Sequence, residues 1–266
     1  MHRAYYLLVV IALAARAAAA DPAQERALSE LATLGPSGLP AACPHAAIGM
    51  TASELAAAWP AFQPDEGYVE LGANMIMPLF DRAARLNAIV IALSPVLEPA
   101  REYVALEKAW GKPAFANAYG ELWLWPAHHL RGTATRDTST VIEAYVPLAE
   151  LDVARSLSIG GMTVAQAEHR LGVTTEDSGE DITFDLATSE YGGVMVYAHV
   201  AHSKIEHVSL HVDYPPGALP RVLAALHAYG PFTRDPHAPD HWRGKRLALD
   251  ASEVDDFAIL TITRVP

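Results

Sequence analysis

Apolar and polar residues alternate along two neighbouring stretches in the last third of the chain. Across 194–200 and 208–212 every second residue is Val, Ala or Leu, and the residues between them are Met, Tyr, His or Ser. A period of two with a single apolar face predicts paired strands that pack on one side of a sheet. Further strands are expected over 86–93, 121–125, 140–146, 245–249 and 257–263.

Two sequence patterns mark the starts of short helices. Thr51 is followed three residues later by Glu54, and Thr163 is followed three residues later by Gln166. Both pairs are capping boxes, in which the hydroxyl and the returning side chain satisfy backbone amides at a helix start. Later helices are expected over 100–110 and 220–229, each with a proline near the first turn and a glycine directly after the end.

The chain contains an internal repeat. Gly49-Met50-Thr51 recurs as Gly161-Met162-Thr163, 112 residues later. At a common spacing of 119 residues, 86–93 matches 205–212, Trp110-Gly111 matches Tyr229-Gly230, and Trp123 matches Trp242. Landmarks in the same order at a near-constant spacing indicate tandem duplication. The increase from 112 to 119 predicts an insertion in the second copy, at the acidic stretch 176–181.

The order of these elements predicts an α+β fold made of two tandem repeats. Each repeat has a capped helix, antiparallel strands, a second helix and two further strands, and the strands follow one another as hairpins without parallel crossovers. We expect a signal peptide at 1–20, an N-terminal segment or linker at 21–47, the first repeat module at 48–150 and the second at 157–266.

The first residues have the features of a cleaved signal peptide. A basic start precedes the apolar run 4–15, and Ala18-x-Ala20 offers a small-residue cleavage site. The run is about half of the roughly 20 residues needed to cross a bilayer. No cysteine lies near the cleavage site to accept a lipid. We therefore expect export to the periplasm or the medium, with no stable membrane anchor after cleavage.

Charge and cysteine content narrow the possible partners. The chain has 19 basic and 31 acidic residues, and removal of the leader with Arg3 and Arg16 leaves 17 basic residues and a net charge of −14. This balance repels phosphate backbones, so we expect no nucleic-acid partner.

Cys43 is the single cysteine, so an intramolecular disulfide is excluded. The predicted role of Cys43 is a buried or inert thiol, with pairing to another chain as the alternative.

The Gly-Met-Thr capping boxes at 49–54 and 161–166, each followed by a short helix and antiparallel strands, resemble modules of two exported bacterial families. One is the outer-membrane assembly lipoproteins of the SmpA/OmlA type, and the other is the tandem-repeat beta-lactamase inhibitory proteins. Both families bind other proteins, so the resemblance implies a protein-binding module. It covers the first half of each repeat. This chain departs from those families in lacking the lipoprotein cysteine and in having an additional helix and strand pair in each repeat. Because the shared motif is a structural cap, no individual binding residue is carried over.

The densest set of candidate metal ligands lies on the hairpin of the second copy. If the apolar faces of its strands share one side, His199, His207 and His211 lie on the other, with His199 opposite His207. Neutral imidazoles that converge in this way bind zinc or copper. The alternative interpretation is a solvated polar face, because the first copy has Ala88 and Ala92 where the second has His207 and His211.

The tryptophans divide into a repeated pair and a single candidate for binding. Trp123 and Trp242 recur in both copies, which indicates a shared role in packing the second helix on the sheet. Trp125 has Gly244 as its counterpart, so the duplicated fold does not require an indole there. We therefore predict that Trp125 contacts a partner.

Motifs of the common enzyme classes are absent from the sequence. It contains no nucleophile elbow, no His-Glu-x-x-His helix, no P-loop and no dinucleotide fingerprint. The leading hypothesis is an exported non-enzymatic bacterial protein that binds another protein in the cell envelope or the secreted fraction. The first alternative is an exported metal-binding protein that uses the histidines above, with zinc as the ion. The second is a hydrolase whose catalytic residues are scattered along the chain.

Overall fold

The computed structural model describes residues 22–94, 97–117, 120–135, 140–175, 177, 179–254 and 257–265. The predicted signal peptide at 1–20 lies outside these residues. The chain divides into two compact units, unit 1 up to Ala144 and unit 2 from Tyr145 onward. The boundary therefore precedes residue 150, where we expected the first module to end.

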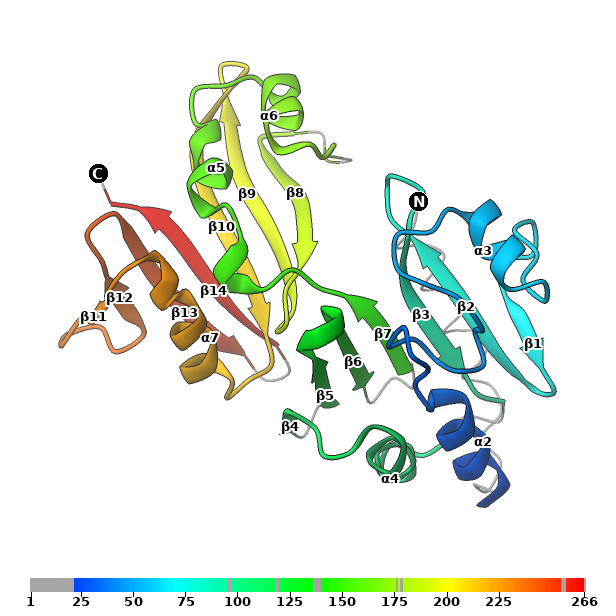
Figure 1. Ribbon diagram of the computed structural model, residues 1–266. Helices are drawn as coiled ribbons and strands as arrows, with labels where there is room; N and C mark the ends of the chain where they lie inside the picture. The colour runs from blue at the N-terminus through cyan, green and yellow to red at the C-terminus, as the bar shows by residue number, and fades with distance from the viewer. Residues whose placement is uncertain are drawn as a thin grey trace. The chain divides into compact units, whose positions relative to one another are not determined.

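Unit 1 is built on an antiparallel sheet with the strand order β1-β2-β3-β7-β6-β5-β4 (Figure 1). Residues from strands and helices meet in one core, in which Ile76, Ile89 and Ile142 of the sheet pack with Leu55 and Leu106 of two helices. The elements of unit 1 are α2 (Pro22–Ala32), α3 (Ala52–Ala58), β1 (Val69–Leu71), β2 (Asn74–Phe80), β3 (Leu86–Ala92), α4 (Pro99–Trp110), β4 (Phe115–Asn117), β5 (Gly120–Trp125), η1 (Pro126–His128), β6 (Leu130–Thr135) and β7 (Thr140–Ala144).

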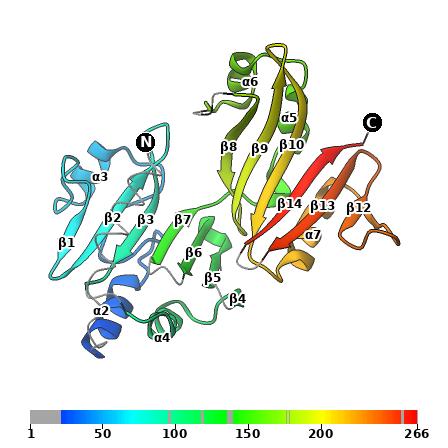
Figure 2. The ribbon, with the colours of Figure 1, turned by 180° about the vertical axis from the view of Figure 1, so that it is seen from behind.

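Unit 2 repeats this layout. Its helices cover one face of the sheet in Figure 1, and the view from behind in Figure 2 shows the strands in front of them. The elements of unit 2 are η2 (Leu148–Glu150), α5 (Val153–Ser156), η3 (Leu157–Ile159), α6 (Val164–Leu171), β8 (Asp181–Thr188), β9 (Gly193–Ala201), β10 (Lys204–Tyr214), α7 (Leu219–Leu226), η4 (His227–Tyr229), β11 (Thr233–Arg234), β12 (His241–Arg243), β13 (Leu247–Val254) and β14 (Phe257–Arg264).

The two sheets have the same strand order. The second is β8-β9-β10-β14-β13-β12-β11, which matches the first strand for strand. In both units a capped helix precedes three strands, and a second helix separates these from the strands that complete the sheet. The prediction of an α+β fold with two tandem repeats is confirmed.

Each repeat has more strands after its second helix than we predicted. We expected two, and the described residues form four in each unit. The strand β6 was missed because Gly132 and Ala134 are too small to produce a hydrophobic alternation, although Leu130 and Ala134 are buried. The strands β4, β11 and β12 are three residues long or shorter, and such short strands leave little periodic signal.

The recurring Gly-Met pair has the same backbone role in both units. Gly49 N–H donates to Leu86 O at 2.8 Å and Leu86 N–H donates to Met50 O at 2.7 Å. Gly161 and Met162 make the same two bonds with Ile205, at 2.7 and 2.9 Å. Both glycines have a positive φ, 90° and 81°, which favours glycine. The motif therefore recurs in both copies because it ties the capped helix to the third strand of each sheet.

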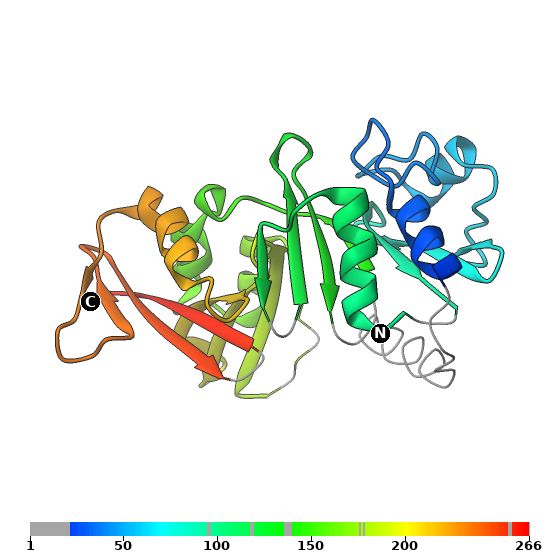
Figure 3. The ribbon, with the colours of Figure 1, turned by 90° about the horizontal axis from the view of Figure 1, so that it is seen from below.

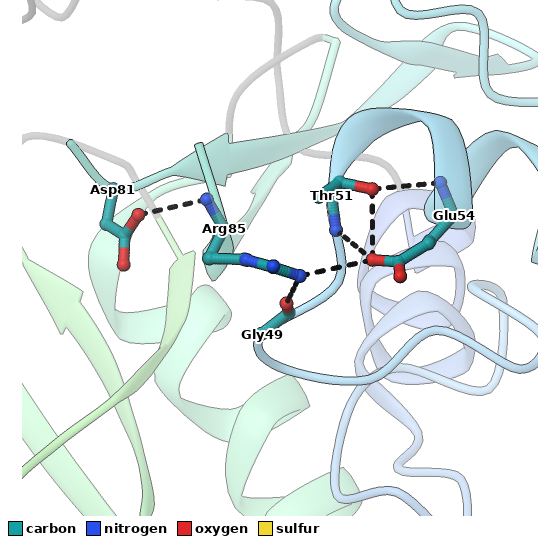
Figure 4. Close-up of polar contacts among 5 residues, drawn as sticks. All are labelled: Gly49, Thr51, Glu54, Asp81 and Arg85. Carbon is teal, nitrogen blue, oxygen red and sulfur yellow. Dashed lines mark hydrogen bonds and ion pairs between the residues drawn. The ribbon is translucent and has the colours of Figure 1, made fainter. Parts of the chain in front are cut away.

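Both predicted capping boxes are present. In unit 1, Glu54 N–H donates to Thr51 Oγ1 at 3.2 Å, and Thr51 N–H donates to Glu54 Oε2 at 2.7 Å (Figure 4). Arg85 donates to the same Glu54 oxygen at 3.3 Å and to Gly49 O at 3.1 Å. The backbone N–H of Arg85 donates in turn to Asp81 at 2.9 Å. In unit 2 the corresponding box forms between Thr163 and Gln166.

The segment that we predicted as an N-terminal linker is part of unit 1. Helix α2 lies along α4 (Figure 3), and Trp110 Nε1–H donates to Ala32 O at 2.6 Å. Leu28, Leu39 and Cys43 are buried in the core. Of the two predictions for 21–47, an N-terminal segment or a linker, the linker is therefore wrong over its described residues. The sequence of this segment has only a weak strand or helix period, so its elements were not predicted, although its apolar residues fill part of the core.

Candidate functional site

The face of the unit 2 sheet opposite its helices carries the histidines that we singled out, together with Tyr197. Along β9, Val194, Val196 and Ala198 are buried, whereas Tyr197 between them is 39 % exposed. The alternation of a strand places His199 on the same side as Tyr197. The open face visible in Figure 2 is therefore chemically distinct from the apolar face beneath the helices.

Asp181, His199 and His207 form a row across three adjacent strands. His199 of β9 is directly opposite His207 of β10 on one side and Asp181 of β8 on the other. The two imidazole centroids are 6.2 Å apart, and Asp181 Oδ1 lies 2.9 Å from His199 Nδ1. The pKa of His199 is raised, chiefly by this hydrogen bond and further by nearby carboxylates. The predicted opposition of His199 and His207 is confirmed.

His211 does not join this pair. Its ring stacks on Tyr197, with centroids 5.5 Å apart and planes 8° apart, and its Nε2 lies 2.9 Å from Ser209 Oγ. Burial lowers the pKa of His211, which favours the neutral imidazole. The convergence of three histidines that we predicted is therefore wrong, because His211 is four residues further along β10 and is held by Tyr197. Among the described residues no three His, Cys, Asp or Glu side chains could hold one metal ion.

Ser209 and His211 are a hydroxyl–imidazole pair without the third member of a catalytic triad. Within the part of the chain that the structure describes, no carboxylate is hydrogen-bonded to His211. A nucleophilic serine relies on a base that is itself oriented by a third group. The geometry consequently gives this pair no support as a hydrolase centre.

A notch separates β10 from β14 at one end of the unit 2 sheet. The ladder between these strands runs from Tyr214 to Leu210, where Leu210 is opposite Ile262, and it stops there. The next pairs would be Ser209 with Thr263 and Val208 with Arg264, but β10 continues beside β9 and β14 continues beside β13. Figure 2 shows β10 and β14 diverging toward this end.

Unit 1 has no such notch at the equivalent positions. The 119-residue spacing relates Ala88, Ile89 and Val90 of β3 to His207, Val208 and Ser209 of β10. In unit 1 these residues are paired with Glu143, Ile142 and Val141 of β7. The duplicated fold can therefore close the sheet here, and unit 2 leaves it open.

The notch forms a groove of about 640 Å³ within unit 2. Its wall on the open face contains Tyr197, His199, His207, Ser209, Thr261 and Thr263, and its other residues are Leu157, Ser158, Gly160, Glu206, Val208 and Arg264. Arg264 Nη2 donates to Ala154 O at 2.9 Å, which holds the end of β14 against α5. Hydroxyl, imidazole, aromatic and guanidinium groups therefore line one groove. Its size is within the range of ligand sites in proteins.

Sequence reasoning found the histidines but missed the groove. Thr261, Thr263 and Arg264 belong to the last strand, and their proximity to Ser209 depends on where the β10–β14 ladder stops. The sequence did contain a signal for this side of the groove. Along β14 the polar residues Thr261 and Thr263 alternate with the apolar residues Leu260 and Ile262, which indicates an open polar face.

Trp125 lies inside a cluster of tryptophans in unit 1. Its ring meets Trp110 edge to face, with centroids 5.1 Å apart, and Trp123 meets the same ring at 5.0 Å. A Cβ on Gly132 would lie 2.6 Å from Trp125, so the indole fills the space above that glycine. The structure therefore gives Trp125 a packing role, and its ring is half-buried; its contact with a partner stays a prediction. The repeated Trp123 and Trp242 are both buried, as the repeat indicated.

Comparison with known proteins does not assign a family or a function to this chain. Among the described residues, no helix is both long enough and apolar enough to cross a lipid bilayer. No family model, no curated protein and no solved structure matches this chain.

Proposed function

We propose that this chain is an exported, non-enzymatic bacterial protein that binds another protein through the open face and groove of unit 2. The observation that carries the proposal is the notch between β10 and β14. Unit 1 pairs the equivalent residues in a continuous ladder, so the opening is not a requirement of the fold. A difference between two copies of one fold is expected where one copy has acquired a binding role.

The groups that line the groove suit a protein partner. Tyr197 presents a large ring that is kept rigid by stacking on His211. Tyrosine and arginine are enriched among the residues that dominate the binding energy of protein interfaces, and Arg264 lies in the same groove. Unpaired strand edges add a means of recognition, because an extended segment of a partner can hydrogen-bond to them.

The sequence adds two further arguments. The excess of acidic over basic residues disfavours nucleic acid as the ligand. The Gly-Met-Thr repeat resembles two exported families that act by binding proteins, and the leader pattern at 1–20 favours a partner in the envelope or outside the cell.

Site-specific photocrosslinking tests the proposal. A benzophenone amino acid replaces Tyr197 in the groove or, as the control, Val104, which is 62 % exposed on α4 of unit 1. The tagged full-length protein is made in its native bacterium, irradiated and purified. We expect one dominant protein adduct from position 197 and none of that mass from position 104. The same adducts from both positions, or none from position 197 in abundant exported protein, would contradict the proposal.

A further inference from the structure

We propose that His199 and His207 form a two-histidine site for a divalent transition-metal ion such as Cu²⁺ or Zn²⁺, with Asp181 as the residue that positions His199. This site lies in the groove of the proposed function but does not rest on protein binding, and its test uses the metal ion alone.

The backbone register brings the two imidazoles together. His199 and His207 are direct partners on adjacent antiparallel strands. The Cβ atoms of such partners are about 4.5–5.5 Å apart and project to the same face. Both side chains rise from the open face of the sheet and line the groove, so hydrated ions reach them from solvent.

Asp181 leaves the outer nitrogen of His199 available for a metal ion. Its carboxylate accepts a hydrogen bond from His199 Nδ1–H at 2.9 Å, which leaves a lone pair on Nε2. Because Asp181 and His207 are on opposite sides of His199 in the sheet, Nδ1 faces β8 and Nε2 is directed away from it. Histidines that ligate metal ions in proteins are commonly oriented by a carboxylate in this way.

The distance between the rings is close to what a shared ion requires. With metal–nitrogen bonds of about 2.0–2.1 Å and a tetrahedral angle, the two ring centres would be about 5 Å apart. The observed separation is 6.2 Å, so binding requires the rings to approach by about 1 Å. His207 is exposed and His199 is partly exposed, so small χ rotations can bring about this change without disturbing the core.

The surroundings favour a cation. Asp181 places a carboxylate 2.9 Å from His199, and Glu206 lines the same groove, so negative charge lies beside the pair. Two imidazole donors select ions such as Cu²⁺ and Zn²⁺ over Ca²⁺ or Mg²⁺, which prefer oxygen ligands. Since the described residues supply no third ligand, water or a group from a binding partner completes the coordination.

Isothermal titration of the full chain with CuSO₄, ZnCl₂ and MgCl₂ measures the site. We expect one ion per chain, with Cu²⁺ bound more tightly than Zn²⁺ and no binding of Mg²⁺. His199→Ala and His207→Ala should each weaken binding by at least about tenfold. Asp181→Asn should weaken it by about 10- to 100-fold, because it removes the positioning group but no ligand.

Two other histidines of the same unit provide the matched controls. His202→Ala removes a ring whose side chain is 93 % exposed, and His211→Ala removes the ring that stacks on Tyr197. Both variants should bind the metal ions with the same affinity as the unchanged chain. Nitrogen NMR adds an independent measurement, in which Zn²⁺ should shift Nε2 of His199 and a ring nitrogen of His207. Absence of binding, or binding that survives loss of His199 or His207 in folded protein, would overturn the site.

Discussion

Glu102 is a carboxylic acid buried in unit 1, and its replacement tests how that unit is stabilised. It lies on α4, is 4 % exposed and accepts a hydrogen bond from Thr140 Oγ1 at 2.5 Å. Burial raises the pKa of Glu102 to about 7, from 4.5 in the unfolded chain. The protonated acid therefore contributes stability that is fully present below about pH 4.5 and is lost as the pH rises through about 7.

The shift corresponds to a free energy of roughly 3 kcal/mol, at 1.36 kcal/mol for each pKa unit. Glu102→Gln keeps the shape and removes the ionisation. We expect the variant to match the unchanged chain at about pH 4.5 and to be more stable by roughly 3 kcal/mol at about pH 8.5. Urea unfolding followed by tryptophan fluorescence measures this difference. The signal reports mainly on unit 1, which holds four of the five tryptophans, Trp59, Trp110, Trp123 and Trp125.

Glu107→Gln controls for the loss of one negative charge, because Glu107 is exposed on the same helix. If the stability difference between the Glu102→Gln variant and the unchanged chain stays constant between about pH 4.5 and pH 8.5, the argument from burial is refuted. A variant that is less stable at every pH would show instead that the Thr140 contact outweighs the desolvation of the carboxylate.

Three further predictions concern the capping boxes, Gly132 and Cys43. Thr51→Ala and Thr163→Ala each remove a capping box and should destabilise their own unit by about 1 kcal/mol in urea unfolding; an unchanged midpoint would show that the box is dispensable. Gly132→Ala places a Cβ 2.6 Å from the Trp125 ring and should destabilise unit 1 by about 1–3 kcal/mol, and no loss would mean that the ring moves freely. Cys43 is buried, which raises the pKa of its thiol to about 12, so Ellman's reagent should label it only after unfolding; rapid labelling of the native chain would contradict this burial.

The sequence predicted the repeat well because its landmarks are local. A capping box needs only Thr51 and Glu54, and the turn before it needs a glycine with positive φ. Periodicity also located β9 and β10, whose inward residues are large and regularly spaced. The predictions failed where tertiary packing decides the outcome. The segment that contains Leu28 and Leu39 has no clear period, yet both residues are buried in the core of unit 1.

In the candidate site, too, some features could be predicted from the sequence and others could not. The opposition of His199 and His207 follows from the alternation of two adjacent strands and could be predicted from sequence. The distance of His211 from them also follows from its position four residues further along β10, but its stacking on Tyr197 could not be predicted. The packing of Trp125 could not be predicted for a similar reason, since the space that holds its ring is created by Gly132 on the neighbouring strand. Sequence reasoning therefore identifies which groups share a face but not which of them touch.

Because the two units are copies of one fold, the pairing of one pair of strands can be compared between them, and the difference bears on function. Both units place their third strand beside their last, and in unit 1 this ladder includes Ala88 and Val90. Small apolar side chains are suited to such a closed ladder. At the equivalent positions unit 2 has His207 and Ser209, and there the ladder is open. The polar substitutions and the loss of pairing thus fall on the same residues. If the histidines were only a solvated sheet face, nothing would require them to coincide with the opening, and this coincidence is the strongest reason to look for a ligand there.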